Sequence, residues 1–402
     1  MRQHSRARTS SQGTKRLNIV LIGNYEPDGQ FSMLRYAEML ERLMRGAGHE
    51  AARVFPPVVF GRMRFLRGGA AKWARYADKY ALGLPWLRWK CRRAEVVHVC
   101  DHSNSMYLWC AGRRPRLITC HDLLAVRSAR GHVAGVKTGA SGRMLQRWIL
   151  RGLRRAEYIV CDSMSTEADV RELGGQRAVV NVVYLALNRK YFPEGKDAVG
   201  QALARFGVAA DSRYLLHIGA NVWYKNRLGA MQIFSRLKKM REFAAMKLLM
   251  AGSPWTEEMR EFRRAEGLED AIIETGIVTD DELRCLYSGA AALLFPSLQE
   301  GFGWPILEAQ ACGCPVITTN RGPMTEVAGE AAILLDDPRD AEQAARAIGE
   351  GWPKLAMLRE AGFRNLDRFS EAKLAAAMSA AYQEVVERWG DTRSRSWSRA
   401  AD

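Results

Sequence analysis

Long apolar runs are missing from this sequence of 402 residues. No stretch approaches the roughly 18 to 20 uninterrupted apolar residues that a helix needs to cross a bilayer. The first sixteen residues, MRQHSRARTSSQGTKR, are basic and polar with no apolar segment behind them, so they do not read as a secretory signal. We therefore expect a cytoplasmic protein with a disordered basic tail over residues 1–16.

Acidic residues are also in short supply, at 44 Asp and Glu against 60 Lys and Arg, a net charge of +16. The imbalance is sharpest in residues 59–93, where ten cations face the single acid Asp78. Aromatic residues are interleaved there, with Trp73, Tyr76 and Tyr80 at helical spacing. This pattern is typical of an amphipathic helix on an anionic membrane surface, but also of a solvated helix face over a local core. Both interpretations stay open.

Motifs for nucleic acid and for metal are lacking as well. The chain has no recognised nucleic-acid-binding motif, so a basic nucleic-acid-binding protein is the less favoured alternative. The close pair Cys312 and Cys314 has no second pair at zinc spacing, and the eight cysteines read mostly as buried, reduced thiols. A cluster of potential ligands near the middle of the first half does not change this, because a histidine inside a strand is more often a core residue; its members are His98, Cys100, Asp101, His102 and His121. We expect no metal.

Strand and helix patterns alternate in two rounds, which predicts an α/β protein with two doubly wound, Rossmann-like domains. The length also favours two cores over one. We place the first domain at 17–190, a linker at 191–212, where the strand rhythm is lost, and the second domain at 213–369. Predicted strands cover residues 17–23, 94–99, 116–120, 157–161, 179–184, 214–219, 247–252, 271–275, 291–295, 315–319 and 331–335. A final helix is expected over 370–389 and a disordered tail over 390–402.

The string EGFGWPILE, residues 300–308, comes after the predicted buried strand that ends at Phe295. Pro305 stands where the first residue of a helix is expected, and two glycines before it let the backbone approach a ligand closely. Free N–H groups at the helix start suit anions and hydroxyls. Glu300 would then lie in the loop and Glu308 one turn into the helix, both within reach of one ligand.

The whole segment FPSLQEGFGWPILEAQACGCPVITT resembles the donor-binding segment of retaining glycosyltransferases of family 4, the group 1 glycosyl transferases of the GT-B fold. That resemblance implies two Rossmann-like domains facing a central cleft. It gives Glu300 the contact with the transferred sugar and Glu308 the ribose hydroxyls. The turn after Glu300 would bind sugar hydroxyls and phosphate; it comprises Gly301, Phe302, Gly303 and Trp304.

Two further segments of the second domain resemble the same family. LLHIGANVWYKNR (215–227) is similar to the segment that holds the diphosphate, which implies donor-binding roles for Gly219, Asn221 and Lys225. Many relatives carry arginine at the positions of Ala220 and Tyr224, and whether Arg227 compensates stays open. TGIVTDDELRCLYSGA (275–290) is similar to the base-binding loop, with backbone groups near Ile277 and Val278 on the nucleobase.

The first domain resembles the family less closely and would form the acceptor side. In the loop GNYEPDGQFSM only Gly29 matches a family glycine. The strand-end pair in CHDL makes His121 a candidate for contact with sugar or acceptor, and Asp101 and His102 are acceptor-side candidates at the tip of another strand. The last helix resembles the family's closing helix, which crosses back to the first domain.

Taken together, these matches predict a retaining hexosyltransferase that uses a UDP- or GDP-linked sugar and needs no metal cofactor. Lys225, Glu300 and His121 are the expected catalytic residues. The acceptor would be a glycan or lipid-linked glycan in bacterial cell-surface polysaccharide assembly, with the enzyme peripheral at the inner face of the cytoplasmic membrane. Another GT-B enzyme, such as a sugar-nucleotide epimerase or phosphorylase, is the alternative.

Overall fold

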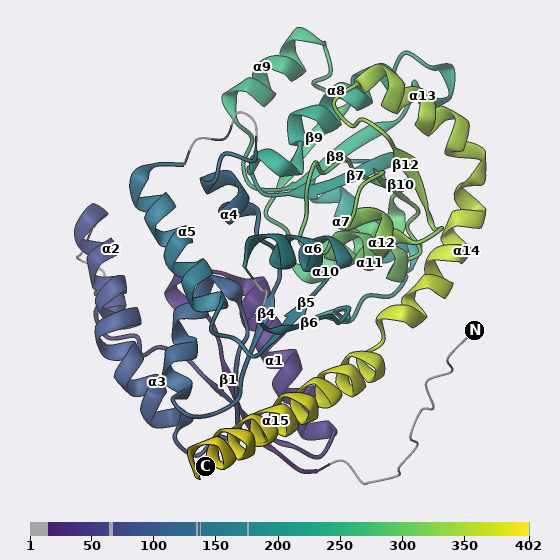
Figure 1. The fold of residues 1–402 in the computed structure, drawn as a ribbon. Coiled ribbons are helices and arrows are strands. Elements are labelled where there is room, and N and C mark those ends of the chain that lie inside the picture. Colours follow the sequence, from purple (N-terminus) through teal and green to yellow (C-terminus); the bar gives the residue numbers. More distant parts are fainter. Residues whose placement is uncertain (1–14, 64–66, 134–135, 137, 175–176, 402) are drawn as a thin grey trace. The chain divides into compact units, whose positions relative to one another are not determined.

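The computed structural model describes residues 15–63, 67–133, 136, 138–174 and 177–401, the last ten of these by their backbone only. Most of the predicted basic tail therefore lies outside the described residues. Two six-stranded sheets form the framework, as Figure 1 shows. The first contains β1 (Asn18–Ile22), β2 (Glu50–Val54), β3 (Val96–Val99), β4 (Arg116–Cys120), β5 (Tyr158–Cys161) and β6 (Val179–Val182). The second contains β7 (Tyr214–Gly219), β8 (Lys247–Gly252), β9 (Ile272–Gly276), β10 (Ala292–Phe295), β11 (Val316–Thr319) and β12 (Ala332–Leu335).

The strand orders are β2-β1-β3-β4-β5-β6 and β12-β11-β10-β7-β8-β9. Every neighbouring pair of the second sheet is parallel, as are β1–β2, β1–β3 and β3–β4 of the first. This confirms the predicted α/β class. In the second sheet the order reverses direction between β7 and β10, and ligands of such sheets bind beyond the carboxyl ends of the strands at that point.

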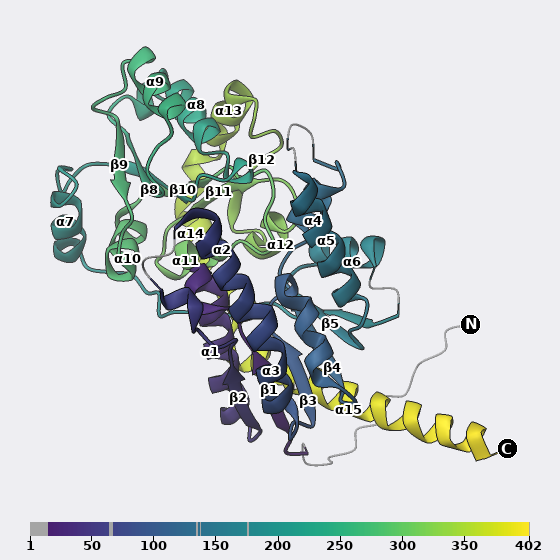
Figure 2. The same cartoon turned by 90° about the vertical axis from the view of Figure 1, so that its left-hand side faces the viewer.

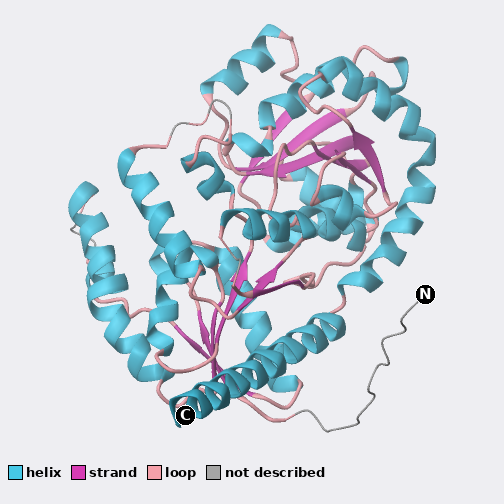
Figure 3. Ribbon diagram, in the orientation of Figure 1, coloured by secondary structure: helices cyan, strands magenta, loops and turns pink. Residues whose placement is uncertain are grey.

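Helices flank both sheets, as Figure 3 shows by colour. Those of the first half are α1 (Phe31–Gly46), α2 (Gly68–Tyr76), α3 (Gly83–Cys91), α4 (Leu124–Ala129), α5 (Ala140–Leu153) and α6 (Met164–Leu173). Those of the second half are α7 (Lys196–Ala204), α8 (Arg227–Leu237), α9 (Glu257–Ala265), α10 (Asp280–Gly289), α11 (Trp304–Ala311), α12 (Met324–Ala328), α13 (Ala341–Gly351), α14 (Leu355–Asn365) and α15 (Glu371–Ala401). No helix in the described ranges is long and apolar enough to cross a membrane.

The core of the second sheet explains why its strands read as unbroken apolar runs. Helices α8 and α13 cover one face and α10 and α11 the other (Figure 1). Leu215, Leu248 and Leu294 pack with Phe234 of α8 in one fully buried cluster. Strands covered on both faces have no solvent side, so polar residues do not alternate along them.

The predicted strands all appear, but β2 was not predicted. Its sequence EAARV carries Glu50 and Arg53, and it pairs with β1 alone at the edge of the first sheet. An edge strand with one solvated face lacks the apolar run by which the central strands were found.

Residues 59–93 differ from the single amphipathic helix that their pattern suggested. A column of helix runs through α2, a π-helical segment (Ala77–Leu82) and α3, visible in Figures 1 and 2. Of the three aromatic residues at helical spacing, Trp73 is 71% exposed, whereas Tyr76 and Tyr80 are half-buried and contact each other. The expected aromatic face is therefore reduced there to one exposed tryptophan.

The residues group into two compact units. Unit 1 comprises 1–118, 155–158 and 375–402, and unit 2 comprises 119–154 and 159–374. The division separates Ile118 from Thr119 within β4, so the carboxyl ends of β4 and β5 group with the second sheet. The domain boundaries expected at 190 and 213 stay a prediction. Helix α15 continues to Ala401 rather than stopping near 389, since no proline comes after it and the single Gly390 is a tolerable cost in a helix.

Candidate active site

The centre of the site in unit 2 is an ion pair between two strand ends. The ammonium of Lys225, in the turn Trp223–Lys225 after β7, lies 2.7 Å from Glu300 Oε1, in the loop after β10. The side chains are only 16% and 9% exposed. Because β7 and β10 are neighbours in a parallel sheet, their carboxyl ends meet at the same edge, which brings together the two residues predicted from separate motifs.

Lys225 is held in place by its surroundings. Its stem packs on Gly219, where an added Cβ would lie 3.3 Å from the lysine side chain, and its ammonium lies 4.9 Å from the centre of the Phe295 ring. The next residue, Asn226, donates to the carbonyls of Pro296 and Pro338 at 3.1 Å each. The loops after β7 and β10 are thus tied to each other around the ion pair.

Two positions of the turn after Glu300 need glycine, each for a different reason. At Gly301 an added Cβ would lie 2.2 Å from the carbonyl oxygen of His121, a contact that backbone cannot relieve. Gly303 has a φ of 108°, a backbone angle that residues with a side chain rarely adopt. Phe302 between them is 5% exposed and its ring packs on Phe369, so its side chain is not available to a ligand. Helix α11 begins at Trp304, one residue before the expected start, and Trp304 Nε1 donates to Ala186 O at 3.1 Å.

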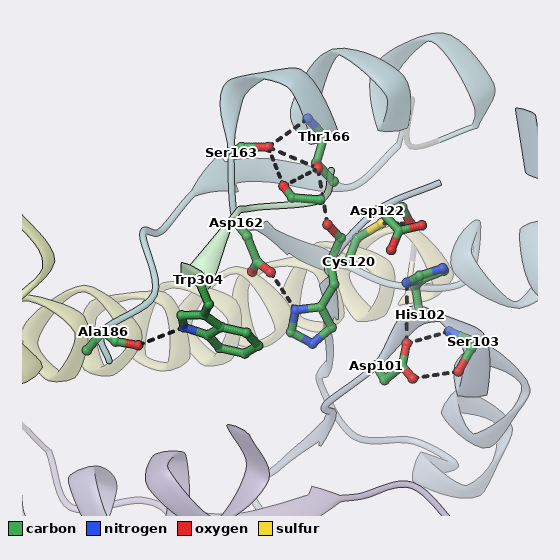
Figure 4. Close-up of polar contacts among 12 residues, drawn as sticks. Asp101, His102, Ser103, Cys120, Asp122, Asp162, Ser163, Thr166, Ala186 and Trp304 are labelled. Carbon is green, nitrogen blue, oxygen red and sulfur yellow. Dashed lines mark hydrogen bonds and ion pairs between the residues drawn. The ribbon is translucent and has the colours of Figure 1, made fainter. Parts of the chain in front are cut away.

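Figure 4 shows the contacts that join this turn to the ends of β4 and β5. Ser163 Oγ donates to Gly301 O at 2.9 Å, and Thr166 Oγ1 donates to His121 O at 3.3 Å. His121 Nδ1 lies 2.5 Å from Asp162 Oδ2, and both side chains are buried. A carboxylate oxygen accepts, so in this contact Nδ1 is the donor and Asp162 Oδ2 the acceptor.

Asp162, Ser163 and Thr166 were missed by the sequence reasoning. A signal for Asp162 was present, because it comes directly after β5, as His121 does after β4. The two strands are neighbours in the first sheet, so the residues after them lie close together. The hydroxyl contacts of Ser163 and Thr166 to backbone carbonyls have no comparable pattern in the sequence.

Glu308 lies one turn into α11 and is 9% exposed. Tyr287, from α10, donates to Glu308 Oε2 at 2.9 Å. Tyr191 also contacts this carboxylate, and burial together with the charge of Glu308 raises the pKa of both phenols, which therefore stay protonated. Two phenols fix the carboxylate at a defined orientation, as a group that recognises a pair of hydroxyls requires.

The predicted base-binding loop lies after β9. Ile277 is 82% exposed, although isoleucine is normally buried, and Val278 is half-buried. The capping box of α10 begins at the next residue: Thr279 Oγ1 accepts from Glu282 N at 3.3 Å, and the Glu282 carboxylate accepts from Thr279 N at 2.7 Å. The loop is thereby held with an apolar side chain outward and its backbone accessible.

The question of the missing arginine has a partial answer. Tyr224 cannot replace an arginine, because a phenol carries no positive charge. Burial, with Glu300 and Asp122 nearby, raises its pKa to about 12, so it stays neutral. Arg227 is 4% exposed and its Nη1 donates to Ser253 O at 2.7 Å and to Asn221 Oδ1. Asn221 in turn donates to Pro254 O, so these residues brace the loops after β7 and β8. Burial lowers the pKa of Arg227, and its Nε and Nη2 find no hydrogen-bond partner among the described residues.

A polar hollow of about 200 Å³ opens beside Glu300 within unit 2. Asp122, Arg127 and Asp169 line it from the side of β4 and α6, and Gln299 and Arg321 from the second sheet's loops. The lining thus contains carboxylates, guanidinium groups and an amide. Such a mixture of hydrogen-bond donors and acceptors suits a polyhydroxylated ligand, whose hydroxyls both donate and accept hydrogen bonds.

The acceptor-side candidates belong to unit 1, apart from His121. Gly29 has φ of 67° and ends a short helical turn after β1. Asp101 is buried and occupied by its neighbours: it accepts from Asn24 Nδ2 and from Ser103 Oγ, each at 2.6 Å, and pairs with His102 at 3.3 Å (Figure 4). His98 is fully buried, with Nδ1 2.6 Å from the hydroxyl of Tyr382 on α15. The described residues contain no group of three or more His, Cys, Asp or Glu arranged to hold a metal ion.

Two parallel doubly wound sheets, with a lysine and a glutamate joined at adjacent strand ends beside a glycine turn, are the arrangement of the GT-B fold class. The comparisons agree with this class. Residues 35–190 match the family model "Glycosyltransferase Family 4", and residues 202–350 match "Glycosyl transferases group 1". The chain belongs to glycosyltransferase family 4.

Relatives of known activity and solved structures lie in the same class. The O-antigen chain mannosyltransferase B of Escherichia coli is 29% identical over 46% of this chain and 49% of its own length. The chain thus spans about half the length of this curated relative. Sucrose-phosphate synthase of Thermosynechococcus elongatus has a TM-score of 0.69 at 20% identity, covering 93% of this chain and all of that one. HepE of Anabaena, in complex with UDP and glucose, has a TM-score of 0.68 at 14% identity, covering 92% and 100%. These two structural likenesses show the fold.

Proposed function

We propose that this glycosyltransferase moves a hexosyl group from a nucleotide diphosphate sugar to a hydroxyl of a glycan or lipid-linked glycan, with retention at the anomeric carbon. The observation that carries the proposal is the buried Lys225–Glu300 pair beside the amides of residues 301–303. A single site thereby offers a cation, a carboxylate and backbone N–H groups that have no hydrogen-bond partner among the described residues. The leaving diphosphate and the sugar hydroxyls need these three kinds of group.

Lys225 is suited to the leaving group. An ammonium has three donors, so it can keep its bond to Glu300 Oε1 and still donate to a phosphate oxygen. Charge that develops on the diphosphate as the glycosidic bond breaks would be stabilised by this pre-positioned cation and by the N–H groups at the start of α11. Glu300 and the glycine turn would orient the sugar.

Glu308 would bind the ribose hydroxyls, and the exposed backbone after β9 the base. The likeness to an O-antigen mannosyltransferase and to a structure with UDP and glucose supports a nucleotide-linked hexose as donor. We propose UDP or GDP as its nucleotide. His121 would contact the sugar or the acceptor. No step of this scheme calls for a metal ion or another cofactor.

A panel of UDP- and GDP-sugars tests the donor. Thermal shift and slow donor hydrolysis are measured for each, with the free sugar and the free nucleotide as controls. We expect one nucleotide sugar to stabilise the protein more than its nucleotide alone. If no member of either series binds or is hydrolysed, the proposal is wrong. Proton NMR of the transferred product then reports retention or inversion.

The cytoplasmic face of the membrane is the proposed place of action, with residues 59–93 as the contact. Trp73, Trp86 and Trp89 are 71%, 39% and 46% exposed, and Lys90 lies within 5 Å of both Trp86 and Trp89 ring centres. Replacing the three tryptophans by serine should move the protein from floating anionic liposomes to the soluble fraction. Unchanged flotation contradicts this part, and retention of DNA by the wild type at moderate salt would favour the nucleic-acid alternative.

A further inference from the structure

Unit 1 contains a second hollow, of about 410 Å³, which none of the candidate donor-binding residues lines. Lys72, Arg75, Tyr76 and Lys79 line one side of it, on the helical column formed by α2 and the π-helical segment. Asp28, in the loop after β1, lines it as well. Residues 72, 75, 76 and 79 are three, four and seven apart, so they share one face of the helix.

The charge in this hollow is strongly unbalanced. Lys79 is paired, with its ammonium 2.8 Å from Asp28 Oδ2. Neither Lys72 nor Arg75 forms an ion pair within the described part of the chain, and no second carboxylate lines the hollow. Three cations against one carboxylate leave two positive charges facing the same space.

Two of the cations are also held in position. The Lys79 ammonium lies 5.3 Å from the centre of the Tyr76 ring and 5.9 Å from that of Tyr80, and the Lys72 ammonium lies 5.8 Å from Tyr76. Ammonium groups over aromatic rings keep their remaining N–H donors available. Less rotamer freedom is then lost when a ligand binds.

A buried carboxylate connects the walls of the hollow. Asp78 has no exposed surface, and it accepts from Tyr25 Oη at 2.6 Å and from the backbone N–H groups of Val59, Phe60 and Gly61 at 2.8 to 3.0 Å. Tyr25 precedes Asp28 in the loop after β1, and Asp78 precedes Lys79. Burial alone would raise the pKa of Asp78, but these four hydrogen bonds outweigh it and hold the pKa below its ordinary value. The sole acid of residues 59–93 therefore fixes the basic face against the β1 loop.

We propose that this hollow binds the phosphate of a phosphomonoester or phosphodiester. The phosphate of a diester or monoester carries one or two negative charges and two or three non-bridging acceptor oxygens, which match a guanidinium fork and two ammonium groups that line one space. The volume accommodates one phosphorylated sugar or one lipid headgroup, whereas a nucleic acid needs a row of cations along its backbone. The hollow adjoins the loop at the carboxyl end of β1, where ligands of such sheets bind. That the phosphate belongs to the acceptor rests on the proposed function; phosphate binding itself does not.

Binding is measured without any donor, by calorimetry with mannose 6-phosphate and by flotation with phosphatidylcholine vesicles that contain or lack phosphatidylglycerol. Arg75→Gln and Lys72→Gln should each weaken binding of the phosphate probe about tenfold. Asp28→Asn should strengthen it, because Lys79 is released from its partner. Arg113→Gln is the matched control: it removes the same charge from an exposed site of unit 1 outside the hollow.

The outcomes separate the sources of the phosphate. Loss of mannose 6-phosphate binding in the two variants indicates a soluble phosphorylated ligand, and loss of vesicle binding alone indicates a lipid headgroup. The proposal is overturned if the wild type binds neither probe, or if Arg113→Gln loses as much as Arg75→Gln, which would reveal general attraction to the net charge. Binding of the nucleotide sugar by the wild type is measured separately by thermal shift. If it binds although no phosphate probe does, the proposal for the hollow is wrong while the proposed transferase function stands.

Discussion

The Lys225 ammonium lies 2.7 Å from Glu300 Oε1, although the two residues are 75 positions apart in the sequence. Both side chains are nearly buried, so each compensates a charge that would otherwise be costly. The pair lies at the carboxyl ends of β7 and β10, where a doubly wound sheet binds its ligand. A ligand phosphate can share the lysine, because one N–H donor is used by the glutamate and two remain.

Glu308→Gln should raise the KM for the donor about tenfold and leave kcat little changed. The carboxylate is oriented by Tyr287, and under the proposed function it accepts from the ribose hydroxyls. The amide of Gln would then weaken binding of a part of the donor that does not react. Steady-state kinetics with the best donor of the panel measure both constants. A fall in kcat with an unchanged KM would place Glu308 in the chemical step instead.

Gly301→Ala should abolish most of the transferase activity and lower the stability by about 1 to 3 kcal/mol, as overpacking does. The new methyl would lie 2.2 Å from His121 O, so the glycine turn or the end of β4 must move. Gly195→Ala is the control, since no atom lies within 4 Å of its added Cβ. Equal activity of the two variants would show that the turn is not built as described.

Asp162→Asn should reduce kcat at least about tenfold, with a smaller effect on the donor KM and no loss of folding. The asparagine has the same shape, but its amide can donate to Nδ1 and so favour the tautomer with the proton on Nε2. The dependence of kcat on pH separates a role of Asp162 in positioning His121 from a role in stability alone. If Asp162 positions His121, the shape of this pH profile should change in Asp162→Asn. A profile that merely scales down would indicate a structural role.

The stability of the protein should fall on acidification because of His217. This residue is fully buried in β7 with Nδ1 2.9 Å from Leu294 O, and burial lowers its pKa to about 3. The unfolded chain takes up a proton near pH 6.5 and the folded chain does not, so stability declines as the pH falls from about 6.5 towards 3. Between pH 7 and 5 this histidine should account for about 2 kcal/mol.

His217→Asn keeps an N–H donor for Leu294 O and removes the titration. The difference in unfolding free energy between pH 7 and pH 5, from urea denaturation, should be smaller in the variant by about that amount. An identical pH dependence in the two proteins would show that His217 is not buried neutral. His49, whose pKa is also lowered by burial, is present in both proteins and cancels from the comparison.

The position of the candidate donor-side residues could be predicted from sequence because they come directly after recognisable strands. A buried parallel strand is an unbroken apolar run, and the residues just after such a strand lie at the ligand edge of the sheet. Lys225, Glu300 and the glycine turn were therefore located correctly relative to the sheet. The edge strand β2 was not predicted because it has no unbroken apolar run. The extent of α15 was not predicted because its sequence has no signal that marks the end of the helix.

The contacts that hold the site together could not be predicted. Tyr287 and Tyr191 meet Glu308 from other segments, and Ser163 reaches Gly301 across 138 positions of sequence. Such contacts depend on packing and leave no local pattern. Likewise Arg227 was an open alternative for the missing arginine, and only its burial between the loops after β7 and β8 shows which groups it contacts.

Turnover of the donor by Glu300→Gln and Lys225→Ala is the most direct test of the active site. Glutamine keeps an acceptor for Lys225, so Glu300→Gln should fold, which circular dichroism and the Tm would confirm for both variants. We expect kcat for sugar transfer to fall by about 10² or more in each, because the cation that stabilises the leaving diphosphate or the carboxylate that orients the sugar is lost. Full transferase activity in either folded variant would contradict the assignment of this ion pair to the active site.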